Sequence, residues 1–270
     1  MFFVKDDNMN GIYYKLVKQV LDQGEHVNGT RELQNVSFEL INPLKNITQN
    51  RSQAKYGVSL YYALGELVWY FAGSNSMKFI SKFGKMWEKL SDDGKTNNSA
   101  YGYRLQTQFG FNQIKTIERL LKKDKYSRRA VLNINTPNKN VYETNDEPCT
   151  IALQFLIRDN RLNLTTIMRS NDLWFGTPYD VLFFTSLQRV IANDLKIEMG
   201  SYYHFATSMH IYERNVKDFD VHNDKYDDDI TVNPIKLNKA TNKLYPLLDG
   251  RDKEEARKDI VSLAQSFDII

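Results

Sequence analysis

The sequence EPCTIALQFLIRDNRLNLTTIMRSND, residues 147–172, contains two apolar segments separated by a short polar turn. Residues 151–157 form an almost continuous apolar run, and residues 162–168 alternate between apolar and polar side chains, which predicts two strands. Asp159 and Asn160 between them are turn-forming residues, so the two strands are expected to form a hairpin. Helical patterns on both sides of the hairpin favour an α+β fold.

Apolar spacing outside the hairpin predicts the remaining elements. Helices are expected at residues 12–21, 59–71, 109–121 and 181–195, a strand at 130–134, and short strands within 30–40. The helix at 59–71 is apolar nearly all round, yet it contains Glu66, a carboxylate whose burial would be costly without a purpose. The acidic stretch around Asp227 is interpreted as a solvated loop.

Composition limits the class of protein. The chain has 270 residues, 41% of them hydrophobic, and no Pro/Gly/Ser-rich linker, so we expect one domain over residues 1–270. No apolar run approaches the ~18 residues of a membrane span, and acidic residues follow the first four positions, which predicts a cytoplasmic protein without a membrane partner. A net charge of +3 is far from a basic stripe for nucleic acid, and an anionic small molecule is the expected partner.

Cys149 is the only cysteine and the first candidate for chemistry. A single cysteine excludes an intrachain disulfide, and four scattered histidines without ligand spacing imply no metal site. A lone cysteine is more often a small buried apolar residue than a nucleophile. However, Arg169 follows in the next segment, and a nearby guanidinium favours the reactive thiolate.

Several motifs occur in a fixed order along the chain. P-C-T-x-x-x-Q-F begins at Pro148, M-R-S-N-D-x-x-x-G-x-P-Y-D ends at Asp180, and H-I-Y spans 210–212. Upstream lie G-E-L-V-W-Y-F-A-G, M-W-E, A-Y-G and Y-S-R-R, which carry Glu66, Trp87, Tyr101 and the arginine pair. This pattern resembles the thymidylate synthase family over most of the chain from about residue 30.

The resemblance implies a fold, a reaction and a set of partners. The expected fold has a mixed sheet flanked by helices and forms a homodimer through the sheet. The expected enzyme is a folate-dependent one-carbon transferase that acts on a pyrimidine nucleoside 5′-monophosphate with 5,10-methylenetetrahydrofolate as co-substrate, which leaves as tetrahydrofolate. No metal is required.

The resemblance also implies roles for individual residues. Cys149 would attack C6 of the pyrimidine, which makes C5 nucleophilic, and Glu66 would move protons near C5. The expected catalytic residues are Cys149, Glu66, Asp180, Arg169 and Tyr101. The expected nucleotide-binding residues are Arg31, Arg128, Arg129, Ser170, Asp180, His210 and Tyr212, with the Arg128–Arg129 pair reaching the partner subunit's phosphate. The expected folate-binding residues are Trp87, Asp172 and Gly176.

Two departures from the family pattern concern the base. Asp180 stands where thymidylate synthases have Asn, and Thr150 stands where they have His. A carboxyl group can accept from the cytosine 4-amino group and share a proton with N3. Within the family, this pattern looks like the deoxycytidylate (dCMP) 5-hydroxymethylases of phages, so the predicted product is a 5-hydroxymethyl nucleotide of dCMP or CMP. The lean towards phage DNA modification is weak.

Alternative interpretations remain open. Asp180 also precedes the apolar helix pattern of residues 181–195, so it could serve as the helix N-cap as well as contact the base. The same fold could instead catalyse thymidylate synthesis or dCMP methylation. A protein of another class, an inactive nucleotide- or RNA-binding module, is opposed by the retention of Cys149, Glu66 and Arg169.

Overall fold

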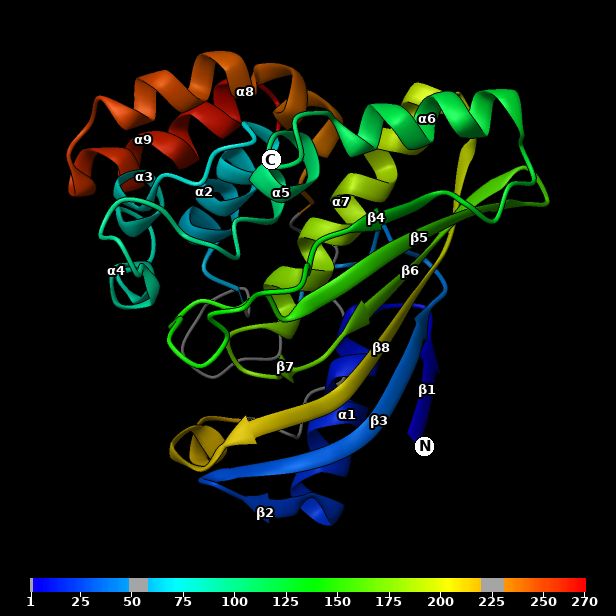
Figure 1. Cartoon of the computed structure of the whole chain (residues 1–270), viewed down its shortest axis with the longest axis vertical. Helices are drawn as coiled ribbons and strands as arrows, with labels where there is room; N and C mark the ends of the chain where they lie inside the picture. Colours follow the sequence, from blue (N-terminus) through cyan, green and yellow to red (C-terminus); the bar gives the residue numbers. More distant parts are fainter. Residues whose placement is uncertain (1, 49–57, 220–230) are drawn as a thin grey trace.

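A large twisted sheet forms the centre of the computed structural model, which describes residues 2–48, 58–219 and 231–270 (Figure 1). His222 and the acidic stretch around Asp227 lie outside the described residues. The strands are β1 (Phe2–Asp6), β2 (Glu25–Val27), β3 (Thr30–Leu40), β4 (Val131–Asn133), β5 (Thr150–Arg158), β6 (Arg161–Met168), β7 (Asn171–Asp172) and β8 (Glu198–Tyr212).

The sheet is mixed, and its central path runs β1-β3-β8-β6-β5-β4. β1 is parallel to β3 and β6 is parallel to β8, whereas β3–β8, β5–β6 and β4–β5 are antiparallel. The predicted hairpin is confirmed: β5 and β6 are joined at Asp159 and Asn160, whose φ angles of 50° and 60° are those of a tight turn. β3 is one strand rather than several short ones. Asn35 adopts a φ of 56° within it, and the pairing with β8 continues on both sides of this residue.

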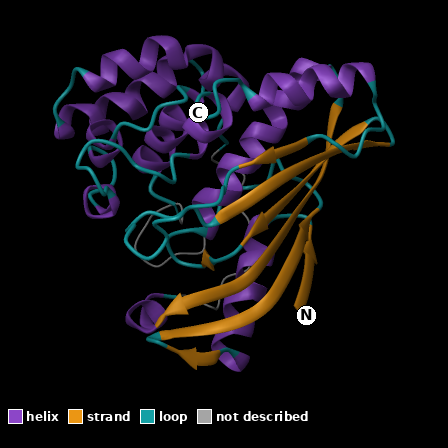
Figure 2. Cartoon of the chain, in the orientation of Figure 1, coloured by secondary structure: helices purple, strands orange, loops and turns teal. Residues whose placement is uncertain are grey.

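The helices pack against one face of the sheet, as Figure 2 shows, and the strand side chains on that face, such as Phe38, Phe155 and Tyr202, are buried. α1 (Met9–Gln23) packs against β1 and β3, and the long α7 (Thr177–Leu195) packs against β6 and β8. α2 (Leu60–Phe71) contacts α7 and the helices α8 (Pro234–Asp249) and α9 (Lys253–Ser266). The shorter elements are α3 (Met77–Ser81), α4 (Met86–Leu90), α5 (Tyr101–Gln106), α6 (Gln113–Lys123) and the 3-10 helix η1 (Glu213–Asp218). The α+β prediction is therefore confirmed.

Two helix starts differ from the sequence-based prediction. α6 begins at Gln113 rather than 109, because Gly110 has a φ of 74° and the Asn112 side chain caps the helix by accepting from the N–H of Lys115. Phe109 and Phe111 are consequently exposed. The N-cap of α7 is Gly176, so Asp180 lies inside the first turn and the N-cap interpretation of Asp180 is wrong.

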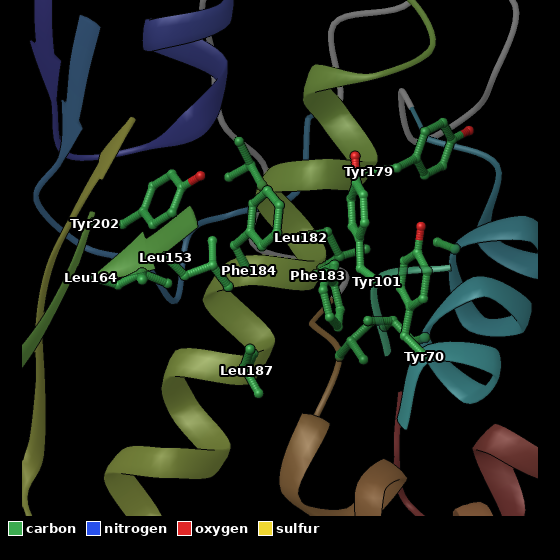
Figure 3. Close-up of a cluster of buried hydrophobic side chains, with 14 of the residues drawn as sticks. Tyr70, Tyr101, Leu153, Leu164, Tyr179, Leu182, Phe183, Phe184, Leu187 and Tyr202 are labelled. Carbon is green, nitrogen blue, oxygen red and sulfur yellow. The ribbon is translucent and has the colours of Figure 1, made fainter. Parts of the chain in front are cut away.

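A cluster of aromatic side chains fills the space between α2, α5 and α7 (Figure 3). Gly102 permits this packing, because a Cβ atom there would lie 1.9 Å from the carbonyl oxygen of Tyr70. The close approach stacks the rings of Tyr70 and Tyr101, with centroids 5.4 Å apart and an interplanar angle of 15°. In Figure 3 both hydroxyl groups point in the same direction, out of the apolar cluster, and both residues line the cavity described next.

Candidate active site

A cavity of about 450 Å³ brings together most of the residues that the sequence singles out. It lies where the N-terminal end of β5, the C-terminal end of β6 and the first turn of α7 meet α2 and α4. Its lining includes Glu66, Trp87, Tyr101, Cys149, Arg169, Ser170, Asp172, Gly176, Asp180, His210 and Tyr212. Segments far apart in sequence therefore place a thiol, a guanidinium and three of the predicted carboxyl groups around one space.

Cys149 and Arg169 are neighbours because β5 and β6 are paired. The Arg169 N–H donates to the Cys149 carbonyl oxygen at 2.9 Å. The Arg169 side chain then turns along the same loop, where Nε donates to the carbonyl of Pro148 at 3.0 Å and Nη2 to that of Glu147 at 2.8 Å. These bonds hold the guanidinium at the mouth of the cavity, beside the cysteine.

The thiol of Cys149 is protonated at neutral pH. Burial raises the pKa of Cys149 to about 11, whereas the nearby positive charge of Arg169 lowers it. The effect of Arg169 has the predicted direction, but burial outweighs it.

Glu66 lies on the buried face of α2, in contact with aromatic hydroxyl groups. The Tyr62 hydroxyl, one helical turn earlier, donates to Glu66 Oε1 at 2.7 Å and accepts from Trp87 Nε1 at 3.1 Å. Burial raises the pKa of Glu66 to about 7, although hydrogen bonds from Tyr62 and Tyr70 oppose the shift. At that pKa the carboxyl group can both give and take a proton near neutral pH.

Asp180 extends from the first turn of α7 into the same cavity. Its Oδ2 accepts a hydrogen bond from Asn171 Nδ2 at 2.8 Å. Burial raises the pKa of Asp180 well above the ordinary value, and the negative charge of Glu66 raises it further. The buried position therefore favours a neutral carboxyl group, which has one donor and one acceptor oxygen.

Asp172 and His210 form a second polar pair in the wall. Asp172 lies at the turn into α7, where its side chain accepts from the backbone N–H groups of Trp174 and Phe175. Burial raises the pKa of Asp172 and lowers that of His210, so burial favours the neutral form of both groups. Next to His210 along β8, the ring of Tyr212 packs edge-on at 5.3 Å.

Three predicted phosphate-binding arginines lie away from this cavity. Arg31 donates to the Leu21 carbonyl and to Glu213, so the structure does not place it at a phosphate site within this chain. Arg129 has a side chain that is 78% exposed, with a long contact to Asp124. Arg128 precedes β4 and is also exposed, which is compatible with a contact to another subunit.

Thr150, the second departure from the family pattern, is fully buried and is not among the residues that line the cavity. Sequence analysis missed Tyr62 and Asn171. Tyr62 could have been found, because it lies four residues before Glu66 and therefore on the same helix face. Asn171 carried no such signal, since its contact with Asp180 depends on the turn between β7 and α7.

The lining fits a flat heteroaromatic ring. Trp87, Leu90 and Phe175 provide apolar surface, and the neutral or charged carboxyl group of Asp172 can meet ring N–H groups. Within residues 2–48, 58–219 and 231–270, no group of three or more His, Cys, Asp or Glu side chains is arranged to hold a metal ion. No helix in the described part of the chain is long and apolar enough to cross a membrane.

A thiol next to a guanidinium, with buried carboxyl groups on a mixed-sheet scaffold, is the arrangement that the resemblance to the thymidylate synthase family predicted. The family model "Thymidylate synthase" matches residues 11–247. The chain thus belongs to the thymidylate synthase family, whose members are folate-dependent one-carbon transferases that bind nucleotide and folate substrates.

Individual relatives agree with this membership. The chain is 30% identical over 219 residues to a deoxyuridylate hydroxymethyltransferase of Bacillus phage SP01, covering 74% of this chain and 56% of that protein. It is 30% identical over 218 residues to a putative thymidylate synthase of Methanothermobacter marburgensis, covering 76% and 91%. A thermostable thymidylate synthase A from Bacillus subtilis shares the fold, with a TM-score of 0.64 at 22% identity over 78% of this chain and 82% of that one. The match thus spans only about half the length of the phage SP01 relative.

Proposed function

We propose that this chain is a pyrimidine nucleotide C5-hydroxymethyltransferase that converts dCMP, or CMP, to the 5-hydroxymethyl nucleotide. Asp180 is the observation that carries the proposal. Its carboxyl group shares the cavity with Cys149, at the place where thymidylate synthases have an amide. A neutral carboxyl group can donate to cytosine N3 and accept from the 4-amino group.

The residues around the cavity support a division of roles. Cys149 adds to C6, which releases electron density to C5, and Arg169 stabilises the thiolate and the 5′-phosphate. Ser170, His210 and Tyr212 are proposed to contact the nucleotide, and Tyr101 to order water near the nucleophile. 5,10-Methylenetetrahydrofolate, bound by Trp87, Asp172 and Gly176, would supply the one-carbon unit.

Hydroxymethyl rather than methyl transfer requires water near C5 at the end of the reaction. Glu66 supports this outcome, because a carboxyl group with a pKa of about 7 can take a proton from water at neutral pH. The hydroxyl groups of Tyr62 and Tyr70 beside Glu66 provide further hydrogen-bonding partners for such a water molecule. The two phage relatives that are 30% and 31% identical are both named hydroxymethyltransferases, which supports the same product class.

The names of these relatives favour a second candidate substrate. Both are deoxyuridylate hydroxymethyltransferases, so the same chemistry on deoxyuridylate (dUMP) is the alternative. Asp180 supports cytosine for this chain. The proposal also includes one domain over residues 1–270 and a homodimer formed through the sheet, in which Arg128 and Arg129 contact the partner subunit's phosphate.

Mass spectrometry of the product tests the proposal. The protein is incubated with 5,10-methylenetetrahydrofolate and either dCMP, CMP or dUMP. A 5-hydroxymethylcytosine nucleotide, with tetrahydrofolate released unoxidised, is the expected result. A 5-methyl nucleotide with an equal amount of dihydrofolate would contradict hydroxymethyl transfer, and turnover of dUMP alone would contradict the assigned base.

A further inference from the structure

Three polar side chains form a hydrogen-bonded chain that ends at Asp180. The Thr177 hydroxyl donates to Asn171 Oδ1 at 2.6 Å, and Asn171 Nδ2 donates to Asp180 Oδ2 at 2.8 Å. Thr177 and Asn171 have 0% and 2% of their surface exposed, so water does not compete for these bonds. Thr177 and Asp180 belong to α7 and Asn171 belongs to β7, which fixes the three residues relative to one another.

The threonine hydroxyl determines how the Asn171 amide is oriented. A hydroxyl group has one proton to donate, and the Thr177 oxygen is nearer to Asn171 Oδ1, at 2.6 Å, than to the carbonyl oxygen of Asp172, at 3.2 Å. The amide oxygen therefore faces Thr177, and the amide NH₂ group faces Asp180. In the opposite orientation the amide NH₂ would face the Thr177 oxygen, and Thr177 would have to donate to the more distant Asp172 carbonyl, so the observed orientation uses the shorter of the two hydroxyl contacts.

A neutral carboxyl group alone does not distinguish cytosine from uracil. If its proton can move to either oxygen, it can donate to N3 and accept from the 4-amino group of cytosine, or donate to O4 and accept from N3–H of uracil. The Asn171 donor removes this freedom, because Oδ2 must stay an acceptor to receive the amide N–H. The carboxyl proton then lies on Oδ1. Burial favours the protonated form of Asp180, because it raises the pKa of this group well above the ordinary value.

We propose that Asn171, held by Thr177, is a positioning residue that sets base specificity by deciding which oxygen of Asp180 donates and which accepts. This inference rests on the proposed function, which assigns cytosine rather than uracil as the preferred base. With cytosine, Oδ1–H donates to N3, and Oδ2 accepts from the 4-amino group as well as from Asn171. Uracil in the same position would place the donor N3–H against the donor Oδ1–H, and the acceptor O4 against the acceptor Oδ2. Neither pair can form a hydrogen bond.

Nucleotide binding separates this role from a purely structural one. In a Cys149→Ser background, which removes covalent chemistry, calorimetry measures the dissociation constants of dCMP and dUMP for four proteins: the background itself, Thr177→Val, Thr177→Ser and Asn171→Leu. Valine has nearly the shape of threonine without the hydroxyl, and serine retains the hydroxyl. We expect Thr177→Val and Asn171→Leu to reduce the preference for dCMP about tenfold, and Thr177→Ser to preserve it.

The possible outcomes have distinct meanings. Equal weakening of dCMP and dUMP, with their ratio unchanged in Thr177→Val, would overturn the positioning role, because damage to the fold alone affects both nucleotides. If the background protein prefers dUMP and Thr177→Val abolishes that preference, the positioning role stands and the proposed base is wrong. If Asn171→Leu fails to fold, as judged by circular dichroism, the Thr177→Val and Thr177→Ser pair decides the result.

Discussion

Arg169 and Cys149 are joined by a backbone hydrogen bond of 2.9 Å between neighbouring strands, while the Arg169 guanidinium is bonded to the loop that precedes the cysteine. The Arg169 guanidinium, whose charge lowers the pKa of the thiol, is thus held by the backbone segment that precedes Cys149. The opposing effect is burial among Asp180, Asp146 and Asp172, which raises the pKa of Cys149 to about 11.

Cys149→Ser is expected to abolish turnover while nucleotide binding is retained. A serine hydroxyl is a much weaker nucleophile at neutral pH than a thiolate. Steady-state kinetics and calorimetric binding of dCMP provide the measurements. Turnover within about tenfold of the wild type would rule out Cys149 as the nucleophile.

Asp180→Asn is expected to shift the preference from cytidylate towards deoxyuridylate. An amide cannot offer the fixed arrangement of one carboxyl donor and one acceptor, and a mismatched buried edge costs about 1–3 kcal/mol, or roughly tenfold to more than a hundredfold in kcat/KM. The measurement is kcat/KM for both nucleotides with the wild type and the variant. An unchanged ratio would remove Asp180 from base recognition.

Arg128→Ala is expected to weaken the binding of nucleotide phosphate, although Arg128 does not line the cavity of its own chain. If it acts on the partner's site, mixing Arg128→Ala with Cys149→Ser subunits will restore activity, because one of the two hybrid sites is then complete. Arg169→Ala is the matched control, since it affects the same chain's cavity. No recovery in mixed dimers would exclude a role across the interface.

Glu66 is expected to make stability fall as pH rises. Its pKa is about 7 in the folded chain against 4.5 for the ordinary group, so between these values the folded state binds more protons than the unfolded state, and stability is lost with increasing pH. The difference corresponds to roughly 3 kcal/mol. Urea unfolding at pH 5 and pH 8 should show a smaller loss for Glu66→Gln than for the wild type. Identical losses would mean that Glu66 has an ordinary pKa.

Tyr62→Phe is expected to move the pH dependence of the reaction. The Tyr62 hydroxyl lowers the pKa of Glu66 by donating to it, so its removal leaves burial less opposed and raises that pKa further. The acidic limb of the kcat profile should move to higher pH if Glu66 acts as a base. Tyr61→Phe, which changes a neighbouring tyrosine outside the cavity, is the control. An unshifted profile in Tyr62→Phe would show that this hydrogen bond does not tune the catalytic base.

The amino-acid sequence alone indicated four of the helices, the β5–β6 hairpin and the family. The apolar runs on either side of Asp159 and Asn160 specify a hairpin because strand alternation and turn chemistry are local properties. The same hairpin brings Cys149 next to Arg169, so the proximity of these two residues could be predicted from the sequence. Ordered motifs located most of the cavity residues, and the apolar pattern of residues 59–71 correctly indicated that Glu66 is buried.

Tertiary structure decided the features that depend on distant segments meeting. Asn171 contacts Asp180 only because β7 turns back into α7 at Gly176, and the complete burial of Thr150 depends on the elements packed around it. Burial itself, which raises the pKa values of Cys149 and Asp180, arises from α2, α5 and α7 packing together. Desolvation depends on every neighbouring side chain, so no local pattern in the sequence predicts its magnitude.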